Sequence, residues 1–175
     1  MKLDLTELAR TVGMRAEEEI NEPCPADLGL ECSSNLVGRL RLDNTGNLLI
    51  VKGEVGASVK LECGRCLTDF VTPLRAEIEE QFRIETVADA FVVLPLEEED
   101  AGGDLVKNNI LDVDELIRQN LLTVLPIRPL CRPECAGLCP TCGENLNVRQ
   151  CGCPPAEIES PFKVLADLLK EEDEK

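Results

Sequence analysis

The sequence predicts an α+β protein: an antiparallel β-meander or partly closed barrel with a few short helices and a C-terminal cysteine-rich zinc-knuckle segment. Apolar and charged residues alternate over much of 36–85, which is typical of half-buried strands. A capped, amphipathic helix pattern follows at 113–124. Six of the ten cysteines then fall between Cys131 and Cys153. These observations indicate a β-rich core followed by a segment organised by thiols.

Turn residues divide the β-rich region into strands. Gly46, within an Asn-Thr-Gly-Asn sequence, is able to take a positive φ and predicts a hairpin turn. Gly53 and Gly56 predict a bulge or bend, and the chain reverses again at 63–66. Pro73 is expected to interrupt the last strand or place it at an edge. The predicted strands lie at 39–43, 48–51, 59–61 and 67–84.

An acidic segment and a helix follow the strands. Residues 95–108 contain too little apolar surface to become ordered alone, so we expect a mobile acidic loop. Asp112 is the predicted N-cap of the helix, with Glu115 three residues later, and Pro126 ends the helix. The helix residues expected to face the core are Leu116, Ile117, Leu121 and Val124.

The chain therefore divides into three predicted regions. Residues 1–125 form the β-meander core with helix 113–124, and 126–156 form the cysteine-rich zinc-binding segment. Ser160-Pro161 predicts a further N-cap and first-turn proline. Residues 157–175 are therefore expected to form a C-terminal amphipathic helix with a frayed acidic tail.

Composition excludes several classes of protein. The chain has 34 acidic and 18 basic residues, a net charge of −16 and no histidine. The missing histidine excludes histidine-based acid–base catalysis and mixed His/Cys zinc sites. The acidity argues against a protein that grips nucleic acid through a broad basic face. Neither a G-x-G-x-x-G nor a Walker sequence is present, so we expect a non-enzymatic protein with no evident small-molecule substrate.

The chemical role of the cysteines depends on the compartment. Met1–Ile20 is broken throughout by charge and does not read as a signal peptide. No apolar run approaches the roughly 20 residues of a membrane span. We therefore expect a cytoplasmic protein with no membrane contact, and in the cytosol clustered cysteines are more often metal ligands or redox groups than disulfides.

The densest cysteine cluster has the pattern of a zinc knuckle. Cys139 and Cys142 have C-x2-C spacing, and Gly143 lets the backbone fold back with its amides toward the sulfurs. Cys151 and Cys153 supply two further thiolates after an eight-residue loop. The four form a closed, structural type of tetrahedral zinc site with no open position for water or substrate. An iron site and metal-free or redox thiols remain alternatives.

Four other cysteines form two further pairs. Cys63 and Cys66 lie at a strand reversal, and Cys131 and Cys135 follow the predicted helix. Neither pair alone satisfies tetrahedral zinc, so together they predict a second four-cysteine site that pins the helix exit to the meander. Two alternatives stay open. Cys131 or Cys135 could complete the other site in a different pairing, or the C-x2-C could be a redox dithiol, although such a dithiol normally opens a helix rather than a strand.

The remaining candidates are less specific. Cys24 and Cys32 lack C-x2-C spacing and are expected to have a structural or incidental role, since free cysteine commonly behaves as a small buried hydrophobe. The basic residues nearest the cysteines are candidates for RNA or protein contact. They are Arg65, Arg128, Arg132 and Arg149.

Several segments together resemble a known family. They are Lys2–Leu8, Leu61–Leu67, Leu125–Asn147, Cys151–Cys153 and Pro161–Leu168, and residues 125–153 are the most specific part. In these segments the chain resembles the YceD family, the large ribosomal RNA subunit accumulation proteins. The resemblance implies a bacterial cytoplasmic or plastid protein linked to accumulation or processing of large-subunit ribosomal RNA. It also implies that Cys63, Cys66 and the cysteines of 131–153 bind metal.

Charge and resemblance together suggest how such a protein acts. A chain of this acidity repels naked RNA over most of its surface, so a basic ribosomal protein is the electrostatically easier partner. We expect a large-subunit ribosomal protein or pre-ribosomal particle as partner, with direct RNA contact second, and two zinc ions as cofactors. The alternative function is a thiol-based redox or metal-responsive protein.

Overall fold

The structure, a computed structural model, describes residues 1–24, 29–88, 90–96 and 105–154 of the 175-residue chain. A six-stranded antiparallel sheet contains β2 (Arg15–Glu22), β4 (Leu36–Asn44), β5 (Leu48–Glu62), β6 (Asp69–Val87) and β7 (Ala90–Pro95) in that spatial order, with β3 (Glu31–Cys32) paired to β5. A second antiparallel sheet contains β1 (Lys2–Asp4), β9 (Ile110–Asp112) and β8 (Val106–Lys107). The two helices are α1 (Thr6–Arg10) and α2 (Val113–Thr123).

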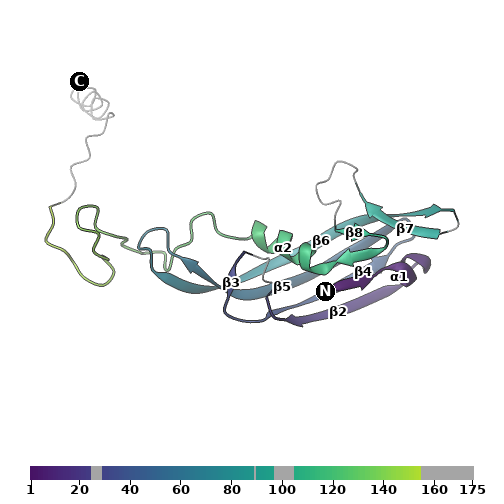
Figure 1. Cartoon of the computed structure of the whole chain (residues 1–175), viewed down its shortest axis with the longest axis horizontal. Coiled ribbons are helices and arrows are strands. Elements are labelled where there is room, and N and C mark those ends of the chain that lie inside the picture. Colours follow the sequence, from purple (N-terminus) through teal and green to yellow (C-terminus); the bar gives the residue numbers. More distant parts are fainter. Residues whose placement is uncertain (25–28, 89, 97–104, 155–175) are drawn as a thin grey trace, which may run out of the picture.

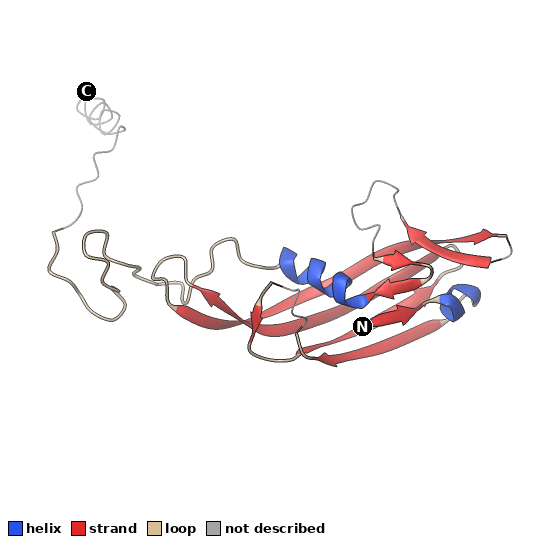
Figure 2. Cartoon of the chain, viewed as in Figure 1, coloured by secondary structure: helices blue, strands red, loops and turns tan. Residues whose placement is uncertain are grey.

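The coarse prediction of an α+β protein with antiparallel sheets and few helices is confirmed (Figure 2). The described strands do not close into a barrel, because β2 and β7 lie at opposite ends of the six-stranded order. The small sheet and α2 lie on one face of the large sheet (Figure 1). None of the helices in the described part of the chain has the length and apolar character needed to cross a membrane.

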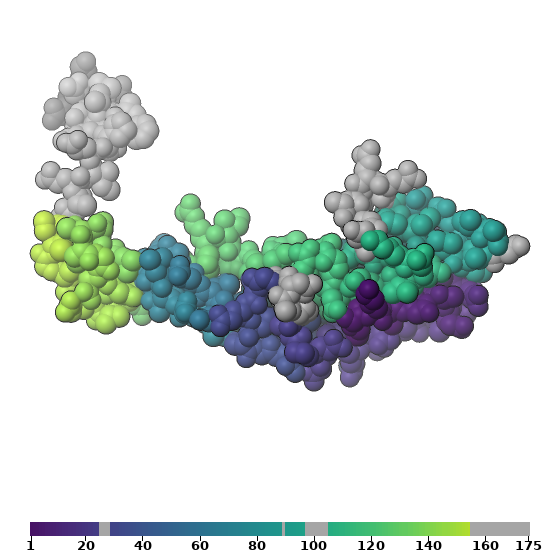
Figure 3. Space-filling view, in the orientation of Figure 1, coloured from purple at the N-terminus to yellow at the C-terminus, as the bar shows by residue number. Residues whose placement is uncertain are grey.

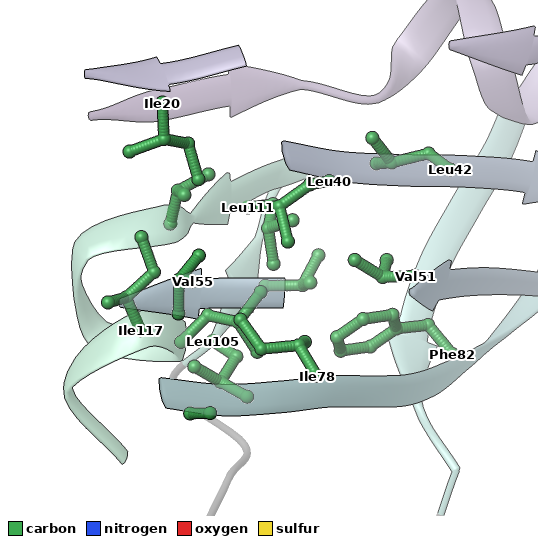
Figure 4. Packing of buried hydrophobic residues seen from close by; sticks show 14 of the residues in the cluster. Ile20, Leu40, Leu42, Val51, Val55, Ile78, Phe82, Leu105, Leu111 and Ile117 are labelled. Atoms are coloured by element: carbon green, nitrogen blue, oxygen red, sulfur yellow. The ribbon is translucent and has the colours of Figure 1, made fainter. Parts of the chain in front are cut away.

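The core lies between the large sheet and these covering elements (Figure 4). Alternate residues of each central strand point inward, as period-2 patterning requires, and the aliphatic side chains among them are buried. Leu40, Val51 and Ile78 represent the three central strands, and each is at most 2% exposed. Burying a side chain of this size contributes about 1.5–3 kcal/mol. Aliphatic side chains thus fill nearly all of this core, in a chain that has only four aromatic residues.

Charged residues form cross-strand rows on the opposite face of the sheet. In one row Glu17 lies opposite Arg41, Arg41 opposite Lys52, and Lys52 opposite Glu79. The Lys52 Nζ lies 2.6 Å from a carboxylate oxygen of Glu79. Exposed pairs of this kind contribute about 0–1 kcal/mol each, so this face is solvated rather than a second core.

Strand β5 is longer than its sequence predicts and pairs without a bulge. Gly53 and Gly56, expected at a bulge or bend, lie within its continuous pairing to β4 and β6. A Cβ atom at Gly53 would lie 2.1 Å from the Arg39 carbonyl oxygen of β4. Glycine is needed there because the neighbouring backbone approaches too closely for a side chain. Pro73 is tolerated in β6 because β7 pairs only with 82–87 and leaves that stretch at an edge.

Helix α2 begins as predicted. The Asp112 carboxylate accepts a hydrogen bond from the Glu115 amide at 3.3 Å. The Glu115 carboxylate in turn accepts hydrogen bonds from Arg118, which hold its pKa at about 2. Leu116, Ile117 and Leu121 are buried, as expected, and α2 packs against β6. The prediction for Val124 is wrong, since this residue follows the helix and is 40% exposed.

Two predicted segments are only partly described. Of the expected acidic loop 95–108, residues 97–104 lie outside the described part of the chain. Its C-terminal end was predicted wrongly, because Leu105 and Val106 are buried and β8 begins at Val106. The predicted C-terminal helix falls within 155–175, which also lie outside the described residues.

The long strands β5 and β6 position the candidate site. Their paired ends, 57–62 and 69–74, continue beyond β4 and are joined by the turn 63–68. After α2 the chain runs along the molecule to meet this turn (Figure 1). We call residues 126–154 the cysteine-rich end. In the space-filling view it extends past the sheet at one extremity of an elongated molecule (Figure 3).

Candidate metal centres

The first cysteine pair sits on the turn between β5 and β6. The Cys63 amide donates to the Thr68 carbonyl at 3.0 Å, and the Leu67 amide donates to the Cys63 carbonyl at 2.9 Å. Leu67 has φ of 55°, a left-handed conformation that favours glycine. The turn thus brings both sulfurs to one side at the cost of backbone strain in Leu67.

The second pair reaches the same place from the exit of α2. The Gly64 amide donates to the Pro129 carbonyl at 2.8 Å, which fixes the incoming chain beside the turn. The Cys63 and Cys135 sulfurs are 3.8 Å apart, and the Cys66 and Cys131 sulfurs are 3.7 Å apart. We call Cys63, Cys66, Cys131 and Cys135 the inner group, since three of the four are no more than 5% exposed.

The sulfur spacing in the inner group fits a tetrahedral ion. Bonds of about 2.3 Å from zinc to sulfur give sulfur–sulfur edges of about 3.8 Å in a regular tetrahedron. The two measured separations match that edge, and all four sulfurs lie within 4.8 Å of one another. Four protein thiolates at this spacing would fill the coordination sphere of one ion.

The outer group comprises Cys139, Cys142, Cys151 and Cys153, whose sulfurs also lie within 4.8 Å of one another. The Gly143 amide donates to the Cys139 carbonyl at 2.9 Å, and Gly143 has φ of 74°. Glycine therefore permits the tight turn that the knuckle pattern predicts. Cys139 is buried but Cys142 is exposed, so this group is the more accessible of the two.

The thiols of each group are unequal as acids. Backbone hydrogen bonds, first that of Cys131, lower the pKa of Cys63 to about 6, and those of Cys142 and Thr141 lower the pKa of Cys139 to about 6. Burial raises the pKa of Cys131 to about 12. The Cys153 pKa is raised to about 12 by its hydrogen bond with Cys142, followed by burial. Four negative charges gather this closely only around a cation, so a divalent ion would favour ionisation of all four thiols.

The structure brings the eight cysteines together in the two sets that spacing predicts. Neither Cys131 nor Cys135 joins the outer group, which removes the alternative pairing considered from sequence. The residues after Cys66 lead into β6, as expected, rather than into a helix.

The four candidate arginines mostly serve the cysteine-rich end itself. Arg65 donates to the Cys135 carbonyl at 3.1 Å, and Arg149 donates to the Glu144 carboxylate at 2.7 Å. Arg132 donates to the Asn147 side-chain oxygen at 2.6 Å. Arg128 is exposed. Three of the arginines thus have a packing role that sequence reasoning did not identify.

Cys24 and Cys32 are not free thiols. They form a disulfide with Cα atoms 6.2 Å apart, and both residues are only partly buried. A structural role agrees with the expectation for these two residues, whereas the expectation of free, buried thiols is wrong. The disulfide ties the chain after β2 to β3, which pairs with β5 at Val59 and Lys60.

Asn145 and Asn147, which sequence reasoning missed, belong to the loop that joins Cys142 to Cys151 and contact the inner group and its turn. The Asn147 side-chain nitrogen donates to the Cys135 sulfur at 3.4 Å, and the Asn145 side-chain nitrogen donates to the Thr68 hydroxyl at 3.2 Å. The available signal was their position, two polar residues inside the loop that joins Cys142 to Cys151. Asparagine side chains can both donate and accept hydrogen bonds, so they can pair with a buried sulfur and with the polar groups of a turn.

An open antiparallel sheet, a capped helix and two four-cysteine groups define a class of small α+β protein with a thiol-organised end. Comparison with known proteins places this chain within a family of that class. The family model described as Large ribosomal RNA subunit accumulation protein YceD matches residues 51–169. The chain therefore belongs to the YceD family, and the resemblance noted from its sequence is confirmed.

Individual relatives agree with this assignment. A protein of Mycobacterium tuberculosis described as uncharacterized is 30% identical over 179 residues, covering 99% of this chain and 84% of the relative. A similar protein of Mycobacterium leprae is 31% identical over 171 residues, covering 95% of this chain and 76% of the relative. A maize protein named Large ribosomal RNA subunit accumulation protein YCED homolog 1, chloroplastic, is 38% identical over 56 residues, covering 30% of this chain and 19% of that protein. No solved structure matches the chain significantly.

Proposed function

We propose that this protein is a non-enzymatic, zinc-stabilised factor in biogenesis of the large ribosomal subunit. It supports accumulation or processing of large-subunit ribosomal RNA in the cytoplasm, and it does so by docking on a large-subunit ribosomal protein or pre-ribosomal particle. The observation that carries the proposal is the pair of four-cysteine groups, each with its four sulfurs within 4.8 Å of one another, in a chain of the YceD family.

The donor set favours zinc as the ion of both groups. All eight ligands are thiolates, and a tetrahedral four-sulfur site accepts zinc or iron. C-x2-C pairs on tight turns, such as Cys139–Gly143, are typical of structural zinc sites. Cys63, Cys66, Cys131 and Cys135 would hold one ion, and Cys139, Cys142, Cys151 and Cys153 the other. Zinc would serve as a structural cross-link, since protein ligands fill every position.

The charge distribution supports a protein partner. The net charge is −16, and exposed glutamates lie beside basic residues across the outer face of the sheet. Arg65, Arg132 and Arg149 are engaged within the cysteine-rich end, which leaves little basic surface for phosphate. A basic ribosomal protein would meet favourable potential over most of this molecule, whereas naked RNA would meet repulsion. Direct RNA contact is therefore the secondary mode.

The test combines cell and protein measurements. Deleting the gene is expected to lower mature large-subunit RNA, and the wild-type gene is expected to restore it. Tagged protein should co-purify with large-subunit protein in a salt-sensitive way, while purified protein shows little affinity for the RNA alone. Unchanged RNA after deletion would contradict the proposed role, and tight salt-dependent binding to isolated RNA would contradict protein docking.

A second candidate function is a thiol-based redox or metal-responsive protein. The exposed Cys142 in the outer group favours it, because an accessible thiolate is the first to meet an oxidant. Elemental analysis before and after mild oxidant separates the two functions. A structural role predicts two zinc ions per chain that resist the oxidant, whereas a sensor predicts reversible loss of the outer ion. An absorption spectrum with visible iron bands would contradict zinc in either case.

A further inference from the structure

We propose that the two cysteine groups are coupled through Asn147, so that metal binding in the outer group strengthens metal binding in the inner group. The loop 143–150 joins the two halves of the outer group, yet its side chain at 147 contacts a sulfur of the inner group. This inference rests on the metal-binding part of the proposed function and goes beyond it, since it assigns a positioning residue and an order of metal loss.

The orientation of the Asn147 side chain is fixed by its partners. Its oxygen accepts from the Arg132 guanidinium at 2.6 Å and from the Ala136 amide at 2.9 Å. Both partners are donors only, so the oxygen must face them. The side-chain nitrogen then faces the Cys135 sulfur, 3.4 Å away, and donates its other hydrogen to the Asn145 oxygen at 2.9 Å. Asn147 therefore presents an N–H group to the sulfur of Cys135, a residue that is only 4% exposed.

Further hydrogen bonds hold the loop against the inner group. The Leu146 amide of the loop donates to the Gly137 carbonyl at 2.9 Å. Leu138, next to Gly137 and outside the loop, donates its amide to the Arg65 carbonyl at 3.1 Å. The Asn145 side chain donates to the Thr68 hydroxyl on the turn that carries Cys66. The loop of the outer group is thus bonded both to the chain next to Cys135 and to the turn between β5 and β6.

An N–H group directed at a thiolate stabilises its negative charge. Hydrogen bonds to ionised acceptors are roughly twice as strong as neutral ones. Partners that contact a metal ligand typically change metal affinity by about 10- to 100-fold when they are removed. Asn147 has this position with respect to Cys135, so its loss should weaken the inner metal without removing any ligand.

Coupling follows from where the loop ends. Cys142 and Cys151 flank the loop at its two ends. An ion held by both would fix these ends and limit the conformations available to Asn147. Without that ion the loop depends on its hydrogen bonds alone, and the N–H group is presented to Cys135 for less of the time. Linkage requires the effect to be reciprocal, so the inner ion also strengthens the outer one.

The test measures metal release from each group of the full-length protein. Protein loaded with cadmium-113 should give two NMR resonances, and adding a chelator reports the loss of each one separately. Asn147→Leu is expected to speed loss of the inner metal about tenfold or more, while Val148→Ala, at an 81% exposed position of the same loop, leaves it unchanged. Asn147→Asp keeps the oxygen that accepts from Arg132 and Ala136 but loses the N–H donor to Cys135. It should therefore speed release of the inner metal at least as much as Asn147→Leu does.

The coupling itself is tested with Cys142→Ser, which removes an outer ligand only. Inner metal loss should accelerate in this variant, and adding Asn147→Leu should accelerate it little further, because both changes act through the same contact. Unchanged inner loss in Asn147→Leu and Asn147→Asp, or factors that simply multiply in the double variant, would overturn the inference. If the wild-type protein binds two ions and the variants release the inner metal at the wild-type rate, only this coupling is refuted. If the wild-type protein binds no ion, the proposed zinc function is refuted as well.

Discussion

Loss of the inner metal should destabilise the fold more than loss of the outer metal. The matched changes are Cys66→Ser and Cys142→Ser, each of which removes one sulfur. An ion in the inner group would join Cys66 to Cys131, which are 65 residues apart in sequence. An ion in the outer group would join Cys142 to Cys151 across a loop of only eight residues. The inner ion therefore restricts far more of the unfolded chain.

The expected difference follows from the entropy of loop closure. In the chain-entropy description, a cross-link over 65 residues contributes about 4.3 kcal/mol and one over nine residues about 2.6 kcal/mol. Cys66→Ser should thus lower the free energy of unfolding by about 1.7 kcal/mol more than Cys142→Ser. For a domain of this size that difference amounts to about 3–7 °C in Tm.

The assay is thermal unfolding of zinc-loaded protein, followed by circular dichroism of the sheet. The same scans with excess chelator serve as the control, since removing both ions should bring all three proteins to nearly one Tm. An equal fall in Tm for the two variants, or a larger fall for Cys142→Ser, would refute the reasoning. It would mean that the inner sulfurs do not share an ion across the long segment.

Three further predictions concern the sheet, the disulfide and the helix. Gly53→Ala should lower the free energy of unfolding in urea by about 2 kcal/mol or more, because the added Cβ would lie 2.1 Å from a carbonyl oxygen of β4. The control Gly152→Ala has open space around the added Cβ and should change this free energy little. Cys32→Ser should lower it by about 2.5 kcal/mol, since the disulfide closes a span of 8 residues, while elemental analysis should still find two zinc ions. Glu115→Gln should lower it by about 0.5–1 kcal/mol at neutral pH. The Glu115 carboxylate has a pKa of about 2 against an ordinary 4.5, so its contribution to stability is full above pH 4.5 and disappears as the pH falls toward 2. In urea titrations, the difference in free energy of unfolding between wild type and Glu115→Gln should therefore be smaller at pH 3 than at pH 7.

The central sheet was largely predictable because its signal is local. Inward residues of β4 and β6 are apolar at nearly every second position, so alternation alone locates these strands. The N-cap at Asp112 was equally clear, because a carboxylate followed three residues later by glutamate is typical of the start of a helix. Both cysteine sets could be predicted for a similar reason: two C-x2-C pairs each need two further thiols, and the chain offers two more closely spaced cysteine pairs to complete two groups of four.

Strand β2 escaped sequence reasoning for a physical reason. Its inward positions carry Ala16, Glu18 and Ile20, so polarity does not alternate and the segment reads as a charged stretch. The strand forms because β4 offers it a continuous backbone partner from Arg15 to Glu22. Pairing with a distant segment is a tertiary effect, and no local pattern reports it.

The disulfide and Asn147 were missed because they depend on approach in space. Cys24 and Cys32 meet only after the chain returns from β2 to lay β3 against β5. Asn147 reaches Cys135 only after the loop between Cys142 and Cys151 has folded back. Spacing along the chain identifies metal ligands well, whereas it carries little information about the groups that surround them.

The acidic residues of β2 have a consequence for self-association. This strand is an edge of the large sheet, and its sequence contains three consecutive glutamates, Glu17, Glu18 and Glu19. A second copy pairing antiparallel about Glu18 would bring these glutamates close to those of the first copy, at a separation within the screening length of about 8 Å at physiological salt. Strand addition between copies is thereby opposed even at high concentration. For a protein with the proposed function, these edge glutamates would also keep free copies apart from one another.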